Sequence, residues 1–180
     1  ATREYWASLE VNRKFGRYKL KEGTATPQNP STNNGHYKLK IGYKYLPMGF
    51  FYGPHVDGYI GHAKYNYGVD TSRTDSLSEV SFTGFVAGVR GSFPLRNVVR
   101  PFLEVEFMAF PKYKEESSAF GDADSVTSVA MQAGASYLLG QKLSMDGAIV
   151  HTANKAKFTG PTREAAYKDT ALRLGMTFTF

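Results

Sequence analysis

Apolar and polar residues alternate with a period of two along most of this chain. The clearest case is His36 to Tyr45, where Lys38, Lys40, Gly42 and Lys44 alternate with tyrosine, leucine and isoleucine. A period of two places the two sets on opposite faces of a β-strand. Seven more stretches follow the same pattern: Tyr5 to Phe15, Val56 to Tyr67, Ser81 to Phe93, Val99 to Ala109, Val126 to Leu139, Leu143 to Ala153 and Thr170 to Phe180. The pattern therefore predicts eight strands.

The segments between these stretches alternate between long and short. Three are short turns, near Pro47, Pro94 and Gly140. Four are long, polar or rich in Gly and Pro, and we predict them as loops: Lys21 to Gly35, Gly68 to Glu79, Pro111 to Ser125 and Asn154 to Tyr167. This alternation is typical of a meander whose two termini lie on the short-turn side. We predict an all-β fold, an eight-stranded antiparallel up-and-down transmembrane β-barrel that forms one domain over residues 1–180.

The composition of the polar face indicates that this face points into the barrel. Glycines lie among its charges, at positions 42, 84, 88, 134 and 175. Glycine weakens a strand facing solvent, whereas small residues between long ones fit a narrow barrel interior. The charges have both signs and can pair inside. We expect a luminal charge network of Glu10, Lys40, Arg90, Glu104, Glu106, Asp146 and Arg173.

With the polar face inside, the apolar face would meet lipid. In the third strand this rule assigns Tyr59, Gly61, Ala63, Tyr65 and Tyr67 to the lipid-facing set, and His62, Lys64 and Asn66 to the lumen. The alternative is a soluble barrel such as a lipocalin, with the apolar face in a core. Period two alone leaves both open.

Hydropathy does not decide between these alternatives. The mean hydropathy of the 180 residues is -0.36 and no apolar run is long enough for a transmembrane helix. A transmembrane strand, however, needs only about 9–11 residues with every second one apolar. The first residue is Ala1 rather than Met, which fits a mature envelope protein after removal of a signal peptide.

Charge and residue types exclude several functional classes. The net charge of +6 would suit nucleic acid, but the 12 Tyr and 13 Phe are spread over strand-like segments. Aromatic strand ends beside basic loops fit a bilayer with phosphate-rich headgroups, and we expect no nucleic-acid partner. The chain has no cysteine, which excludes a disulfide scaffold or thiolate metal site. The four histidines lie on separate segments, so we expect neither a metal nor another cofactor.

Several segments carry a resemblance to a known group of proteins. Arg100-Pro101-Phe102-Leu103-Glu104-Val105, Gly140 to Ile149 and Ala171 to Phe180 resemble strands of the small outer-membrane barrels of Gram-negative bacteria. This group includes the opacity (Opa) proteins, the OmpA transmembrane domain, OmpX and Ail. The resemblance implies a bacterial outer-membrane location. It also implies that Phe178 and Phe180 form the signal read by the barrel-assembly machinery.

One segment bears on catalysis. His151-Thr152-Ala153-Asn154, with Glu164 downstream, is similar to the His-x-Ser-Asn stretch and downstream Glu of outer-membrane lipid A deacylases. His151 falls on the lipid-facing parity and Thr152 on the other face. Ala153 occupies the place of the nucleophile, and alanine has no hydroxyl to attack an ester. We therefore expect a protein that is not an enzyme.

These features predict a surface-exposed structural or adhesion barrel whose four external loops contact host, surface or envelope ligands. The first alternative is a narrow channel or lumen-gated pore, and the second is a lipid A-modifying enzyme. Basic residues flank the first and last predicted loops, and they form a candidate lipopolysaccharide-binding rim: Lys19, Lys21, Lys155, Lys157, Arg163 and Lys168. A solvated basic rim without a ligand explains the same residues equally well.

Overall fold

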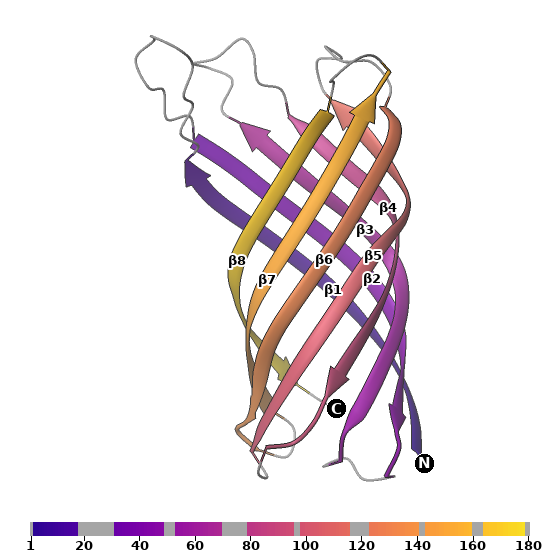
Figure 1. The fold of residues 1–180 in the computed structure, drawn as a ribbon. Helices are drawn as coiled ribbons and strands as arrows, with labels where there is room; N and C mark the ends of the chain where they lie inside the picture. The colour runs from indigo at the N-terminus through magenta and orange to yellow at the C-terminus, as the bar shows by residue number, and fades with distance from the viewer. Residues whose placement is uncertain are drawn as a thin grey trace.

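The computed structural model of the chain describes residues 2–17, 31–48, 53–69, 79–95, 98–115, 123–140, 143–159 and 164–178. These residues contain eight strands (Figure 1): β1 (Thr2–Arg17), β2 (Ser31–Leu46), β3 (His55–Val69), β4 (Val80–Ser92), β5 (Val99–Glu115), β6 (Ala123–Leu138), β7 (Leu143–Phe158) and β8 (Glu164–Phe178). Within these ranges no helix is long and apolar enough to cross a membrane. The predicted all-β class is confirmed.

Each strand pairs antiparallel with the strand that follows it, so the eight strands form one sheet in chain order. The sheet is rolled, because side chains from strands that are not neighbours meet on its inner face. Lys38 of β2 contacts Glu106 of β5, and the rings of Tyr67 on β3 and Tyr167 on β8 stack with centroids 5.0 Å apart. In Figure 1, β5 to β8 pass in front of β1 to β3 with the opposite slant. The predicted up-and-down order is confirmed.

The two ends of the rolled sheet carry different connections. One end, the turn end, carries segments 47–54, 93–98 and 139–142 together with the start of β1 and the end of β8 (Figure 1). At the other, the loop end, β1, β3, β5 and β7 end and β2, β4, β6 and β8 begin. The predicted loops at Pro111 to Ser125 and Asn154 to Tyr167 are wrong in large part, because the strands continue into them. The predicted loop at Lys21 to Gly35 likewise loses residues 31–35 to β2.

The alternation explains why these strands are longer than predicted. Tyr113, Phe158 and Tyr167 lie in the predicted loops, and their rings pack together with Phe82. The lysines between them, which favoured a loop, occupy the alternate positions on the outer face: Lys112, Lys114, Lys155 and Lys157. Burial of these rings stabilises the extended strands.

Inward-facing residues form three layers between the two ends. Starting at the turn end, β5 contributes Phe102, then Glu104 and Glu106, then Met108, and all four are buried. The middle layer is therefore charged, and the layer toward the loop end is an apolar core. This core consists of Ala63, Tyr65, Tyr67, Val80, Phe82, Val86, Met108, Ala156 and Phe158.

The orientation predicted for β3 is wrong. Tyr59, Ala63, Tyr65 and Tyr67 are buried in the interior, whereas Lys64 takes the outward position. The prediction treated tyrosine as an apolar, outward-facing residue. Two of these hydroxyl groups find carboxylate partners inside, and a buried tyrosine hydroxyl requires such a partner.

The outer face is apolar around its middle. Ile60 is 61% exposed and Leu174 74% exposed. Similar exposed side chains occur on every strand: Leu9, Ile41, Val89, Leu103, Val105, Met131, Ile149 and Leu172. The rolled sheet thus has a polar centre and an apolar outside, the reverse of a water-soluble domain.

Candidate functional site

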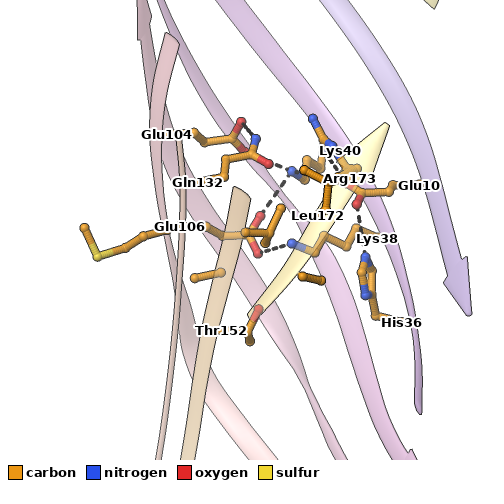
Figure 2. A pocket seen from close by; sticks show the side chains of 14 residues that line it. Glu10, His36, Lys38, Lys40, Glu104, Glu106, Gln132, Thr152, Leu172 and Arg173 are labelled. Atoms are coloured by element: carbon orange, nitrogen blue, oxygen red, sulfur yellow. Dashed lines mark hydrogen bonds and ion pairs between the residues drawn. The ribbon is translucent and has the colours of Figure 1, made fainter. Parts of the chain in front are cut away.

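The middle of the interior holds a network of buried ion pairs (Figure 2). Lys38 Nζ lies 2.8 Å from Glu106 Oε1, and Tyr65 donates its hydroxyl to the same oxygen at 2.9 Å. The other oxygen of Glu106 lies 3.2 Å from Lys40 Nζ and 3.0 Å from the hydroxyl of Tyr59. Each carboxylate oxygen therefore receives one cation and one hydroxyl, which offsets the cost of burying the charge.

Lys40 joins this carboxylate to a second one. Its Nζ also lies 3.2 Å from Glu104 Oε1, and the hydroxyl of Tyr59 lies 2.5 Å from the same oxygen. The side-chain amide of Gln132 on β6 donates to the other oxygen of Glu104 (Figure 2). Strands β2, β3, β5 and β6 are thus connected through one set of polar side chains.

Glu10 extends the network to the two edge strands of the sheet. Its Oε1 lies 3.0 Å from His36 Nε2, and its Oε2 lies 3.5 Å from Arg173 Nη1 and 3.9 Å from Lys40 Nζ. Arg173 belongs to β8 and Glu10 to β1, so this contact connects the first strand to the last.

The charges of the network balance. Three carboxylates, Glu10, Glu104 and Glu106, face three basic side chains, Lys38, Lys40 and Arg173 (Figure 2). The cavity between them has a volume of about 20 Å³, which is about the space that one water molecule needs. The network leaves no room for a larger ligand. Its chemical role is therefore to hold non-adjacent strands together.

Two residues predicted for this network lie in another group nearer the turn end. The Arg90 guanidinium covers the ring of Phe102, 3.7 Å from its centroid, and its Nη2 lies 3.5 Å from Ser136 Oγ. Ser136 donates its hydroxyl to Asp146. Arg90 and Asp146 therefore contact the same hydroxyl, whereas the structure brings together the other five predicted members.

A third polar group at the turn end includes Ser, His and Asp side chains. His55 Nε2 lies 2.9 Å from Ser92 Oγ and 3.3 Å from Asp57 Oδ2. Its Nδ1 contacts the Arg100 guanidinium, which also donates to the carbonyl of Gly53 at 3.1 Å. A nucleophilic triad requires the serine and the carboxylate on different ring nitrogens. Here both contact the same nitrogen and a cation occupies the other, so the group is a structural cluster.

Aromatic rings that pack edge to face lie in the interior toward the loop end. Phe82 packs against Tyr67, Tyr113 and Tyr167 with centroids 6.0, 5.4 and 5.7 Å away, and Phe158 lies 5.2 Å from Tyr113. Asn154 donates its side-chain amide to the hydroxyl of Tyr67 at 2.6 Å. Aromatic packing thus fills the interior between the charged layer and the loops.

The segment predicted to bear on catalysis lies on β7. His151 and Ala153 both face outward and Thr152 faces inward, as the alternation predicts. His151 Nδ1 lies 2.8 Å from Thr170 Oγ1 on β8, while Glu164 pairs with Lys155. Within the described ranges no carboxylate contacts the other ring nitrogen of His151. The arrangement therefore lacks both the serine and the carboxylate of the deacylase pattern.

The residues of the predicted rim separate into two groups. Lys155, Lys157 and Lys168 lie on the outer faces of β7 and β8 near the loop end, and Lys155 Nζ lies 2.6 Å from Glu164 Oε1. Lys19, Lys21 and Arg163 lie outside the described residues. Of the predicted assembly signal, Phe178 ends β8 opposite Leu143, and Phe180 is outside the described residues.

The predicted luminal network omits five interior partners: His36, Lys38, Tyr59, Tyr65 and Gln132. Lys38 and Gln132 follow the alternation of the predicted members on their own strands, so the pattern already placed them inside. The two tyrosines carried a different signal, the need of a buried hydroxyl for a partner. His36 is the first residue of its predicted strand and shares the inward parity of Lys38 and Lys40.

Comparisons with protein-family models, with curated proteins and with solved structures found no match to this chain. In the part of the chain that the structure describes, no three His, Asp or Glu side chains gather in a way that could hold a metal ion.

Proposed function

We propose that this chain is an integral β-barrel of the bacterial outer membrane, with a structural or adhesive role carried by the connections at its loop end. The observation that carries the proposal is the inversion of polarity in the rolled sheet. Buried Lys38, Lys40, Glu104 and Glu106 fill the centre, while leucine, isoleucine and valine cover the outside. Lipid around the barrel accounts for such an exterior, and water does not.

The height of the apolar exterior supports this proposal. Phe85 and Phe93 are exposed at its two borders and are eight positions apart along the chain. Eight residues rise about 26 Å along a strand, or about 20 Å along the axis of a barrel whose strands tilt by about 40°. The apolar band of outer-membrane barrels is about 25 Å tall.

Aromatic residues gather at both borders. Tyr5 and Tyr43 pack edge to face near the turn end, with centroids 5.4 Å apart. Tyr37 and His62 stack near the loop end, with centroids 6.1 Å apart. Two aromatic girdles around an aliphatic band are typical of transmembrane barrels, because amphipathic rings prefer the lipid headgroup level.

The packed interior favours a structural role over a channel. The charged layer encloses a cavity of about 20 Å³, and the rings of Phe82, Tyr113 and Phe158 fill the space above it. Reconstitution in planar bilayers tests this directly. We expect no steady conductance, and large sustained openings would contradict the structural role.

The adhesive part of the proposal needs a test on whole cells. An epitope inserted in segment 70–79 should be labelled by antibody on intact bacteria, whereas one inserted in segment 93–98 should require permeabilised cells. Attachment of expressing bacteria to host or abiotic surfaces should then fall when segments 18–30, 70–79, 116–122 and 159–163 are shortened. A barrel that folds but gives equal attachment with and without these segments would contradict adhesion.

A further inference from the structure

A bulge in β5 directs one phenylalanine away from the barrel near the loop end. Thr83 on β4 pairs with Lys112, while Phe85 pairs with Ala109, so β5 has an extra residue at this point. Phe110 lies in the bulge with a φ angle of 50° and is 88% exposed. A bulky residue rarely adopts a positive φ. Strained backbone of this kind clusters at functional sites, and bulges often redirect a side chain there.

Three lysines surround Thr83 on the polar side of this bulge. Lys64 on β3 and Lys112 on β5 both lie opposite it on the outer face, and Lys114 follows two residues along β5. Neighbouring strands are about 4.8 Å apart, and alternate residues along a strand about 6.7 Å. Long flexible side chains at this spacing can reach one phosphate-sized group. We call Lys64, Lys112 and Lys114 the lysine patch.

The lysine patch is unpaired within the residues that the structure describes. None of its three lysines forms an ion pair with another described residue. Among the described residues of β4 and β5 near the patch, Glu79, which precedes β4, is acidic and exposed, and Glu115 takes the inward alternate position on β5. The lysines of β7 and β8 differ, because Lys155 is paired with Glu164 at 2.6 Å.

Aromatic rings line the apolar border directly beside the patch. His62 and Phe85 lie one row nearer the middle of the barrel and contact each other edge to face, with centroids 5.8 Å apart. Phe85 is 67% exposed and Phe107, further along the same surface, 53% exposed. The outer face here presents three lysines that are unpaired among the described residues, next to an apolar surface marked by Phe85, Phe107 and Phe110.

We propose that the lysine patch binds the phosphate groups of lipid A, with its acyl chains lying against Phe85, Phe107 and Phe110. This rests on the proposed outer-membrane location, in which the loop end faces the outer leaflet. A phosphorylated glycolipid matches the surface because it presents anionic groups and several acyl chains together. The site lies on β3 to β5, away from the rim of β7 and β8 that the sequence suggested.

The test uses the refolded full chain in detergent micelles and native mass spectrometry with added lipid A. We compare wild type with the triple variant Lys64→Gln, Lys112→Gln and Lys114→Gln. The matched control is Lys155→Gln, Lys157→Gln and Lys168→Gln. We expect the first variant to lose about tenfold or more in apparent affinity, and the control to lose less than about twofold.

Ligand controls use the wild-type protein and therefore do not depend on whether a variant folds. Dephosphorylated lipid A should bind at least about tenfold more weakly than lipid A, and inorganic phosphate in millimolar excess should not compete. The site would be overturned if lipid A and its dephosphorylated form bound equally well, or if both triple variants lost the same affinity for lipid A. It would also be overturned if the protein retained phosphatidylglycerol as well as it retains lipid A. Heat-modifiable gel mobility of the same samples distinguishes a failure of the lipid A site from a failure of the membrane barrel. A protein that never forms a compact, detergent-resistant species contradicts the membrane barrel itself.

Discussion

Lys38 and Glu106 meet across the interior, Nζ to Oε1 at 2.8 Å, although their strands β2 and β5 are separated by two others in the sheet. Backbone ladders connect only consecutive strands. The curvature that brings β2 opposite β5 is therefore stabilised by buried side chains. Ion pairs of this kind hold the rolled sheet around its polar centre.

Removing Lys38 should reveal the free-energy cost of burying the Glu106 carboxylate without its closest cation. In Lys38→Met, Glu106 keeps Lys40 and two tyrosine hydroxyls but loses its closest cation. We expect the free energy of unfolding to fall by about 3 kcal/mol, measured by urea titration with the fluorescence of Trp6. The double variant Lys38→Met and Glu106→Gln should recover part of this loss. Strictly additive losses would mean that the two residues do not interact.

Arg173 and Glu10 should couple the first and last strands. Their side chains are about a quarter exposed (24% and 23%), so solvent weakens the pair and we expect Arg173→Ala to cost about 1 kcal/mol. Arg173→Glu should cost more, because it faces Glu10 with a like charge. Adding Glu10→Arg should restore stability. A charge-reversed Arg173 variant as stable as wild type would show that the edge strands meet in some other way.

Gly88 and Gly91 provide a matched pair on β4. A Cβ at position 88 would run into the ring of Tyr59, which is fixed by Glu104 and Glu106, whereas a Cβ at position 91 meets nothing within 4 Å. We expect Gly88→Ala to lower the melting temperature and to cost about 1–3 kcal/mol. Gly91→Ala should be close to neutral. Similar effects at the two positions would be inconsistent with the inward packing of Tyr59.

The outer face offers a test that distinguishes lipid from water. Ile60 lies near the middle of the apolar band and Thr83 at its border. In lipid vesicles, Ile60→Lys should lower folding stability by about 2–4 kcal/mol, and Thr83→Lys by at most about 1 kcal/mol. Both positions would tolerate lysine in a water-exposed face. Equal, small effects would therefore argue against lipid around Ile60.

Strand number and order were predictable from the sequence because two separate signals indicate them. The alternation of apolar and polar residues marks each strand, most clearly in β2, β4 and β5. Turn residues mark the connections between strands. The orientation of β3 is not predictable from its tyrosines, because tyrosine suits both the interior and the outer face. Ile60 and Val56, both exposed, were the better guides on that strand.

Partners within the interior were only partly predictable. Parity places Glu104 and Lys40 on the same face of the sheet, but their contact depends on how the sheet rolls. Strands β2 and β5 come together only in three dimensions, and no spacing along the chain encodes that distance. For the same reason the alternation does not distinguish Arg90 and Asp146, which both contact Ser136 nearer the turn end, from the members of the central network.

The most direct test of a membrane barrel is refolding from urea with and without a bilayer. With lipid vesicles present, we predict that the chain folds to a compact species that migrates faster on unheated than on heated gels. Without lipid or detergent it should aggregate, because side chains such as Leu174 and Ile60 would remain exposed. A folded, monodisperse protein in buffer alone would contradict the account.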